Sequence, residues 1–251
     1  MINSIKRSIP KRYRRALLRS YEKYYLANKL RGENFKCPVC SWSFESFLPG
    51  GYNGRKNARC PRCGSFERHR TMFLYLTEHS NLLNQNLRVL HFAPEPSLTP
   101  VLKQNKNFTE YITADLFLPT ADEKIDITDI PYSDNYFDLV IVSHVLQEVP
   151  SYETGVTELH RILNSGGTLI LQEPFDFSMP TTIHRKNLDQ AEQDKCFGKA
   201  GMVLRRFGND FLSELRETGF EVEIFDPRES YDSSLIKTFN LGDVVIGCVK
   251  L

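Results

Sequence analysis

The chain has 251 residues, of which 41% are hydrophobic and 25% are charged, a composition typical of a globular α/β domain with an accessory module. No apolar run approaches the roughly 18 residues of a membrane span and the first residues lack the apolar core of a secretory signal, so we expect a cytoplasmic protein. The net charge of +1 hides an asymmetry, because residues 1–36 carry eleven Lys and Arg against two Glu and the remainder carries 21 against 29.

The basic N-terminal segment, residues 1–34, contains a predicted amphipathic helix. Residues 10–31 have a proline in the first turn and are followed by a glycine, as is typical of helix ends. One stripe of this helix holds Tyr13, Leu17, Tyr21 and Tyr24, and most basic side chains lie off it. The helix can lie on an anionic membrane surface, contact nucleic-acid phosphates, or pack its stripe on the main domain, and the sequence leaves these three alternatives open.

Two Cys-x-x-Cys pairs lie in residues 35–66. Cys37 and Cys40 are separated by 19 residues from Cys60 and Cys63. Each pair directs two sulfurs toward one point, and four thiolates complete a tetrahedral zinc site without an open position. The spacing therefore predicts a structural Zn²⁺ ion in a zinc-ribbon module that depends on the metal for its folding.

The main domain is predicted to span residues 67–251, beginning with a helix at about residues 66–79. Charged and polar side chains crowd the start of that helix, namely Glu67, Arg68, His69 and Arg70. The sequence leaves open whether they face a cleft or hold the zinc module against the domain.

Residues 87–117 predict a strand, a turn, a helix and a second strand that closes at Asp115, which is the repeating unit of a parallel doubly wound sheet. Ligands of such sheets bind beyond the carboxyl ends of the strands, and an acid at the end of the second strand accepts ribose hydroxyls. Asp115 lies 22 positions after Ala93, close to the expected offset of roughly 20. The unit predicts a nucleoside site, although the turn from His91 to Ser97 contains no glycine.

Further strands are predicted at residues 125–130, 136–143 and 168–171, with a helix at 153–163. Polar side chains follow two of these strands, at the edge where the ligand is expected. They are His144, Gln147 and Glu148 after one strand, and Gln172 and Glu173 after the other.

A polar insertion at residues 175–206 interrupts the alternation of strands and helices. An insertion after the carboxyl end of a strand hangs over the ligand site, which predicts a lid or substrate contacts. A helix at 211–218 and strands at 220–225 and 244–249 complete the predicted domain.

The segments DITDIPYSDNYFDLVIVSHVLQEV and LHRILNSGGTLILQEPF resemble the class I S-adenosylmethionine-dependent methyltransferases of the type 11 group. The resemblance covers residues 87–173 well and 207–251 loosely. It implies a Rossmann-like sheet of seven strands whose last strand is antiparallel, and S-adenosylmethionine as the cofactor.

The resemblance also implies roles for individual residues. Asp115 matches the acid that binds the ribose, Asp126 matches the acid that binds the adenine amino group, and Ile127 packs on the adenine ring. The family's first motif, Asp-x-Gly-x-Gly-x-Gly, is represented by His91, Ala93, Glu95 and Ser97. The full set predicted to bind the cofactor is His91, Phe92, Ala93, Glu95, Asp115, Leu116, Asp126, Ile127, Ser143 and His144.

A catalytic base is needed only if the methyl acceptor is a weak nucleophile such as an alcohol. The candidates by position are His144, Glu148, Glu173 and His184. His144 is favoured because an unperturbed imidazole accepts a proton near neutral pH, and the alternative is that it only lines the cofactor pocket.

Three functions are compatible with these patterns. The first is a methyltransferase for a small or carbohydrate acceptor, such as a glycan precursor, with the basic helix near an anionic membrane. The second is an RNA methyltransferase that holds RNA with the zinc ribbon and the basic helix; related ribbons accompany some ribosomal RNA guanine methyltransferases and some apparent glycan methyltransferases. The third is a methyltransferase-like binding protein without activity.

Overall fold

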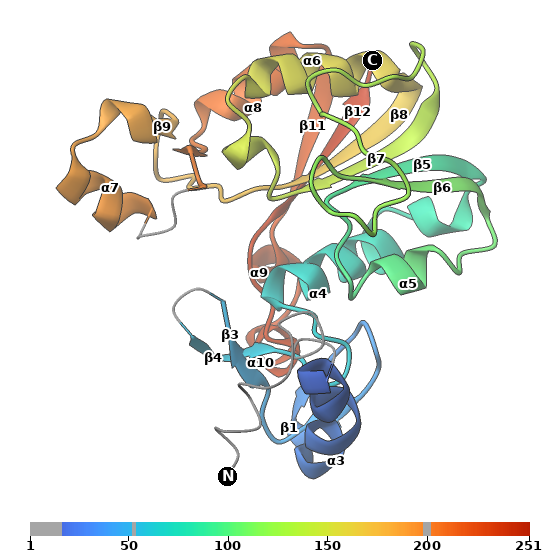
Figure 1. Ribbon diagram of the computed structural model, residues 1–251, viewed down its shortest axis with the longest axis vertical. Helices are drawn as coiled ribbons and strands as arrows, with labels where there is room; N and C mark the ends of the chain where they lie inside the picture. The colour runs from blue at the N-terminus through green and yellow to red at the C-terminus, as the bar shows by residue number, and fades with distance from the viewer. Residues whose placement is uncertain (1–16, 52–53, 198–201) are drawn as a thin grey trace.

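The computed structural model describes residues 17–51, 54–197 and 202–251. Its largest part is a six-stranded sheet in the order β11-β12-β8-β7-β5-β6 (Figure 1). Strands β5 to β8 run parallel, and β12 is antiparallel to both of its neighbours. The predicted α/β class and the antiparallel last strand are therefore confirmed. The strands are β5 (Leu87–Phe92), β6 (Phe108–Ala114), β7 (Phe137–Ser143), β8 (Leu163–Gln172), β11 (Phe220–Phe225) and β12 (Val245–Lys250).

The prediction of seven strands is wrong for the described part of the chain, because residues 125–130 do not join the sheet. Only an isolated bridge between Ala114 and Glu123 marks the place where a further edge strand would pair. The chain turns instead, since Asp126 accepts a hydrogen bond from the backbone N–H of Thr128 at 2.9 Å and its carbonyl accepts one from Asp129 at 3.0 Å.

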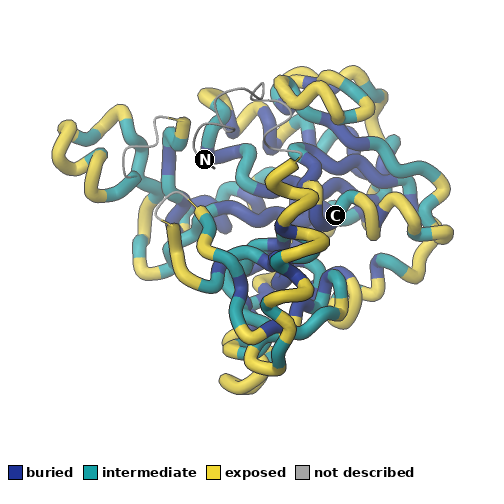
Figure 2. The backbone as a smooth tube through the Cα atoms, turned by 60° about the horizontal axis from the view of Figure 1, so that its bottom comes forward, coloured by how far each residue is buried: buried dark blue, intermediate teal, exposed yellow. Residues whose placement is uncertain are grey.

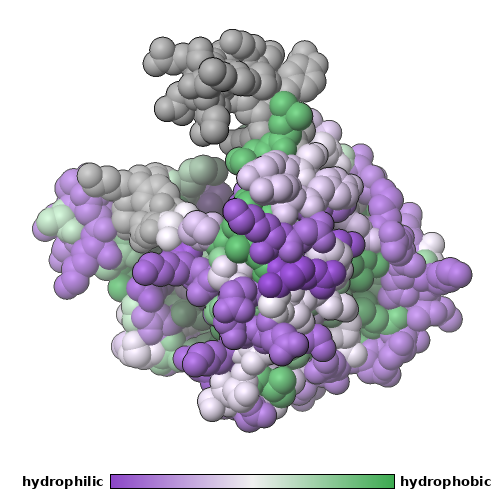
Figure 3. Space-filling view, turned by 90° about the horizontal axis from the view of Figure 1, so that it is seen from below, coloured by the Kyte–Doolittle hydropathy of each residue, from purple (hydrophilic) through white to green (hydrophobic). Residues whose placement is uncertain are grey.

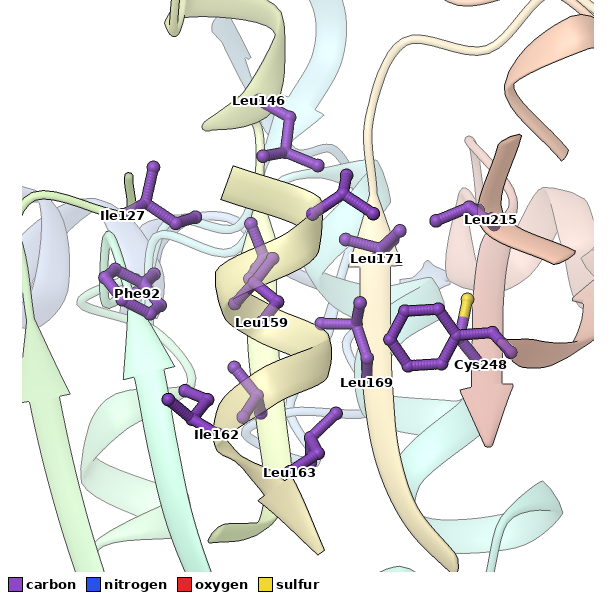
Figure 4. Packing of buried hydrophobic residues seen from close by; sticks show 14 of the residues in the cluster. Phe92, Ile127, Leu146, Leu159, Ile162, Leu163, Leu169, Leu171, Leu215 and Cys248 are labelled. Atoms are coloured by element: carbon purple, nitrogen blue, oxygen red, sulfur yellow. The ribbon is translucent and has the colours of Figure 1, made fainter. Parts of the chain in front are cut away.

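Both faces of the sheet are covered. Along β7, Val140 and Val142 point to one side, where α6 (Tyr152–Ile162) and α8 (Asp210–Glu217) pack, as Figure 4 shows for the leucines of α6 and β8. Leu139 and Ile141 point to the other side, where α4 (Glu67–Leu74) and α5 (Thr99–Leu102) pack. This alternation explains the uninterrupted apolar sequence of β7 and the dark, buried centre of Figure 2.

The four cysteines belong to a small unit of two hairpins at residues 31–66, which we call the Cys module. It contains β1 (Arg31–Lys36), β2 (Ser43–Phe44), β3 (Leu48–Gly50) and β4 (Arg55–Arg59). Its Phe44 and Phe47 belong to the same buried cluster as Met72 of α4 and Val89 of the sheet. The Cys module and the α/β domain therefore share one core.

A segment that the sequence did not predict to be helical ties the Cys module to the C-terminal half of the chain. Between β11 and β12 the chain forms α9 (Pro227–Ser230) and α10 (Ser233–Phe239), which reach down beside the Cys module (Figure 1). There the Asn240 side chain donates to the carbonyl of Asn57 at 2.7 Å, and Arg70 donates to the carbonyl of Asn240 at 2.8 Å.

The described part of the N-terminal segment is helical from residue 17 to Lys29 and includes a π-helical turn. Its anchor is Glu22, whose carboxylate accepts two hydrogen bonds of 2.7 Å from Arg59 of the Cys module. The apolar stripe does not pack on the main domain, because Leu17, Tyr21 and Tyr24 are exposed. The segment lies at the lower end of the molecule in Figure 1, the end that faces the viewer in Figure 3. Tyr13 and the predicted helix start lie outside the described residues.

The insertion at residues 175–206 projects from the body of the molecule (Figure 1). It contains a short antiparallel pair, β9 (Ile183–His184) and β10 (Arg205–Arg206), and the helix α7 (Gln190–Phe197). Its role as a lid stays a prediction. Within the described ranges, no helix combines the length and the apolar character needed to cross a bilayer.

Candidate functional site

A cavity of about 450 Å³ opens at the carboxyl ends of β5, β6 and β7. It lies where the sequence predicted a nucleoside site, because parallel strands bring the ends of these segments together. Among the residues predicted to bind a cofactor, those that line it are Phe92, Ala93, Asp115, Leu116, Asp126, Ile127 and His144. The other three, His91, Glu95 and Ser143, are buried beside the turn and do not line it.

Asp115 lies just past the end of β6 and shapes the loop at the mouth of the cavity. Its Oδ1 accepts hydrogen bonds of 2.7 Å from the backbone N–H groups of Phe117 and Leu118. In the described structure Oδ2 has no such partner, so one carboxylate oxygen is left for a ligand. Phe117 is 84% exposed beside it, a lining residue that the sequence did not indicate.

Asp126 and Ile127 form the opposite side of the cavity. Asp126 accepts from both the backbone and the hydroxyl of Thr128, at 2.9 and 2.8 Å. Ile127 is buried against the core cluster that includes Phe92 and Leu146, three side chains that lie near one another in Figure 4. The turn thus presents an acid and an aliphatic side chain to one cavity.

Two residues at the cavity have left-handed backbone conformations without being glycine. Ala93 has a φ of 48° at the end of β5, and His144 has a φ of 56° at the end of β7. Such conformations cost free energy and persist only where the surroundings impose them, and they cluster at ligand sites. Ala93 has the left-handed backbone conformation that glycine adopts most easily.

The turn after β5 buries a hydrogen-bonded pair of side chains. His91 donates from Nε2 to Glu95 Oε2 at 2.9 Å, while the hydroxyl of Tyr111 donates to Nδ1 at 2.7 Å. Burial alone would raise the pKa of Glu95, but the hydrogen bond from His91 and the nearby positive charges outweigh it and bring the pKa to about 2. Glu95 is therefore ionised at neutral pH, and its second oxygen, Oε1, has no partner.

His144 belongs to the cavity wall. Its backbone N–H donates to the carbonyl of Gln172 at 2.8 Å, and the amide of Gln147 donates to its Nδ1 at 3.2 Å. Burial and the charge of Arg68 lower the pKa of His144 to about 3, so the ring is neutral and is a weak proton acceptor.

The three other candidate bases lie in different surroundings. Glu148 lines the same cavity as His144, and burial raises its pKa. Glu173 is fully buried, which raises its pKa to about 8, although it accepts hydrogen bonds from the backbone N–H groups of Val145 and Leu146. His184 lines a separate cavity of about 440 Å³ beside the insertion, so the structure does not bring it to the predicted nucleoside site.

Glu173 also lines a second cavity of about 360 Å³. The rings of Phe175 and Phe177 form one of its walls, stacked with their centroids 6.0 Å apart. Asp226 and Arg228 reach it from the segment between β11 and β12. The sequence did not indicate these two residues, because they lie about 50 positions after Phe175 and Phe177 and meet them only in the folded chain.

The four predicted metal ligands come together. The Sγ atoms of Cys37, Cys40, Cys60 and Cys63 all lie within 4.8 Å of one another. Two of the separations are 3.6 Å, between Cys37 and Cys63, and 3.7 Å, between Cys40 and Cys60, close to the roughly 3.8 Å edge of a tetrahedron with zinc–sulfur bonds of about 2.3 Å. The donor set therefore fits a zinc ion.

The four sulfur atoms are too close together to ionise independently. Four thiolates within 4.8 Å of one another repel, so a cation is needed for all of them to be ionised together. Each pair closes a tight turn, in which Ser41 N–H donates to the Cys37 carbonyl and Gly64 N–H donates to the Cys60 carbonyl.

Comparison with known sequences identifies part of the chain. Residues 78–171 match the family model described as a methyltransferase domain. The chain is 34% identical over 55 residues to the demethylmenaquinone methyltransferase of Staphylococcus epidermidis, covering 22% of this chain and 23% of that protein. It is also 34% identical over 79 residues to the ubiquinone/menaquinone biosynthesis C-methyltransferase UbiE of a Geobacter species, covering 32% of each. The matched segments thus span about a quarter to a third of these relatives.

The fold has a counterpart among solved structures. The YcgJ protein of Bacillus subtilis superimposes with a TM-score of 0.51 at 11% sequence identity, covering 73% of this chain and all of that one. At this identity the likeness concerns the fold alone.

Proposed function

We propose that this chain, whose residues 78–171 match the model of a methyltransferase domain, is an S-adenosylmethionine-dependent methyltransferase with a small-molecule acceptor. The observation that carries the proposal is the cavity at the sheet edge. It places Asp115, Asp126 and Ile127 around one space of about 450 Å³, within the usual size of a cofactor pocket.

Three residues of the cavity contact different parts of the nucleoside. The free Oδ2 of Asp115 accepts hydrogen bonds from the ribose hydroxyls, and Asp126 accepts one from the adenine amino group. Ile127 packs against the base. The bound sulfonium supplies an activated methyl group. The protein contributes positioning and exclusion of water, because in-line transfer needs the acceptor atom opposite the breaking carbon–sulfur bond.

We place a general base at Glu148, for an acceptor that reacts through a hydroxyl group. Glu148 lines the cofactor cavity, and its raised pKa makes the carboxylate a better proton acceptor than an ordinary glutamate. The low pKa of His144 makes it a weaker candidate, and the hydrogen bonds of Glu173 give it a role in shaping the turn after β7. His184 lines a different cavity from the one that holds the proposed nucleoside.

The second cavity supports a small, polar acceptor. The rings of Phe175 and Phe177 suit the apolar face of a sugar ring. The ion pair of Arg228 with Asp226, at 2.6 Å, lines the same cavity and offers polar contacts for the hydroxyls of the sugar. A carbohydrate such as a glycan precursor fits this lining. The partial relatives are named for quinone precursors, which are also small-molecule acceptors.

We also propose that the four cysteines hold a structural zinc ion. The donor set is complete, so the metal has no open position for chemistry and instead stabilises the Cys module. Because the module shares its core with the sheet, the metal also supports the helix α4, whose Met72 lies in that core.

The proposal is tested by titrating the purified protein with S-adenosylmethionine and S-adenosylhomocysteine in a calorimeter, followed by transfer assays with a labelled methyl group. Binding of both compounds and label in the low-mass fraction of a cell extract are the expected results. Label in RNA would overturn the acceptor class. No heat and no thermal shift at millimolar ligand would leave a methyltransferase-like binding protein without the cofactor.

A further inference from the structure

Five residues near the end of the cofactor cavity each have a buried polar atom without a hydrogen-bond partner. Of the five, only His144 lines the proposed nucleoside site. The atoms are Arg68 Nε, His69 Nε2, Glu95 Oε1, His144 Nε2 and Gln172 Oε1. Native proteins rarely leave buried polar atoms unpaired, so each such atom requires an explanation. We call these five residues the polar cluster.

The polar cluster comes from four segments, and hydrogen bonds connect Arg68, Gln172 and His144 directly. The Gln172 amide donates to the carbonyl of Arg68 at 3.1 Å, and Gln172 accepts from the backbone of His144. His69 Nδ1 lies 3.0 Å from the hydroxyl of Ser97, two residues after Glu95. The charges of Arg68 and Glu95 act on both imidazoles, so these two residues lie near His69 and His144.

The proton positions divide the free atoms into donors and acceptors. Nδ1 of His69 accepts from the backbone N–H of Phe66 at 3.2 Å, so Nε2 carries the proton. Nδ1 of His144 accepts from Gln147 in the same way. With Arg68 Nε–H this makes three free donors, one of them on a cation.

Two acceptors of the polar cluster are also without a partner. Oε1 of Glu95 belongs to an ionised carboxylate whose other oxygen is held by His91. Oε1 of Gln172 has no partner, while the amide nitrogen of the same side chain donates to the backbone carbonyl of Arg68. A ligand that satisfies the cluster therefore needs one anionic acceptor group and one cationic donor group close together.

We propose that the polar cluster binds the α-amino-acid end of the cofactor, with the carboxylate on Arg68, His69 and His144 and the ammonium group on Glu95 and Gln172. The inference rests on the proposed function, because that function supplies a ligand with a nucleoside at one end and an amino acid at the other.

The position of the polar cluster agrees with such a ligand. His144 belongs to both the cluster and the nucleoside cavity, and Glu95 follows the cavity residue Ala93 by two positions. The turn after β5 has side chains where the related methyltransferases have glycines, so its backbone cannot approach a ligand in the same way. Side chains supply the hydrogen bonds instead.

Two of the donors come from the helix that follows the Cys module. Arg68 and His69 lie in the first turn of α4, five and six residues after the metal-ligand candidate Cys63. Arg70 fixes this turn, because its buried guanidinium donates to the carbonyl of Ser65 at 2.8 Å and to that of Asn240 at 2.8 Å. The Cys module thereby supports the helix turn that carries Arg68 and His69.

The test compares two ligands that share the nucleoside and differ at the other end. S-Adenosylhomocysteine carries the amino acid and 5′-methylthioadenosine lacks it. Binding of both is measured by calorimetry for the wild type, for Glu95→Gln and for Arg68→Met, with Glu221→Gln on the exposed side of β11 as the control.

We expect the wild type to bind S-adenosylhomocysteine at least tenfold more tightly than methylthioadenosine. Each cluster variant should lose at least tenfold affinity for S-adenosylhomocysteine while its affinity for methylthioadenosine stays within twofold, which also shows that the variant is folded. The control should match the wild type for both ligands.

Other results would overturn the inference in distinguishable ways. If the wild type binds both ligands equally, or if the variants weaken both equally or neither, the proposed function stands and the assignment of the polar cluster falls. If the variants bind S-adenosylhomocysteine normally but raise the KM of the acceptor, the cluster belongs to the acceptor site. If the wild type binds neither ligand, the proposed function falls as well.

Discussion

Substitution of Asp115 separates two tasks that its carboxylate performs. Oδ1 holds the loop through the N–H groups of Phe117 and Leu118, while Oδ2 is free for the ribose of a bound nucleoside. Asp115→Asn keeps an oxygen for the loop and removes the charge and one acceptor. Asp115→Ala removes both functions. The two variants therefore distinguish loss of a ligand contact from loss of loop structure.

The expected loss of affinity follows from the hydrogen bonds that the free oxygen can accept. A hydrogen bond to a charged group contributes about 1.5–3 kcal/mol, which corresponds to roughly 10- to 150-fold in Kd. We expect Asp115→Asn to weaken S-adenosylhomocysteine binding within this range and to leave the free energy of unfolding almost unchanged. Asp115→Ala should weaken binding further, because the loop at the cavity mouth also loses two hydrogen bonds.

Calorimetric titration with S-adenosylhomocysteine measures the effect on binding, and urea unfolding of the ligand-free protein measures the effect on stability. Asp134→Ala serves as the control, because this exposed carboxylate pairs with Arg161 away from the cavity and should leave Kd unchanged. If Asp115→Ala binds the ligand within twofold of the wild type, Asp115 does not contact the ribose and the proposed orientation of the nucleoside is wrong.

Three further predictions concern the metal, the core and pH. Cys60→Ser should release zinc and lower the free energy of unfolding by about 3 kcal/mol or more, as measured by metal analysis and urea unfolding. Cys196→Ser, outside the four-cysteine cluster, is the control and should retain the metal. A stable Cys60→Ser variant that is fully loaded with zinc would refute the tetrathiolate site. Arg70→Met should cost about 3 kcal/mol of unfolding free energy, because it leaves buried carbonyls without their donor; a loss below about 1 kcal/mol would contradict this role. His144 has a folded pKa of about 3 against an ordinary 6.5, so the unfolded chain binds more protons and stability falls as the pH drops below about 6.5, by about 2 kcal/mol between pH 7 and pH 5. His144→Asn, which tolerates the left-handed backbone and leaves Arg68, Glu95 and His69 in place, should reduce that decline, and an unchanged slope would exclude His144 as its source.

The structure also changes how the basic N-terminal helix is understood. Its apolar stripe is exposed in the described residues, and its contacts with the Cys module include the ion pair of Glu22 with Arg59 and the buried side chain of Ala27. Arg19 also donates to the carbonyl of Cys63 at 3.2 Å. Periodicity located the stripe, but it could not show which side of the helix faces the protein. These contacts fix that orientation.

Local sequence patterns determined much of this protein. The spacing of the two cysteine pairs, the apolar run of β7 and the acid at the end of β6 depend on residues close together in the chain, so strand periodicity and turn geometry were enough to place them. The place of Asp115 at the cavity also followed, because parallel strands present their carboxyl ends at the same edge. Asp126 was assigned to the site by the family resemblance alone.

Only the tertiary structure decided which side chains complete the site. Gln172 contacts Arg68 across 104 positions, and Arg70 contacts Asn240 across 170, and no local pattern encodes such pairs. Whether residues 125–130 extend as a strand or turn was likewise set by competition between sheet pairing and the hydrogen bonds of Asp126. Contacts of this kind depend on how whole elements pack, and packing energies become definite only when the entire chain has folded.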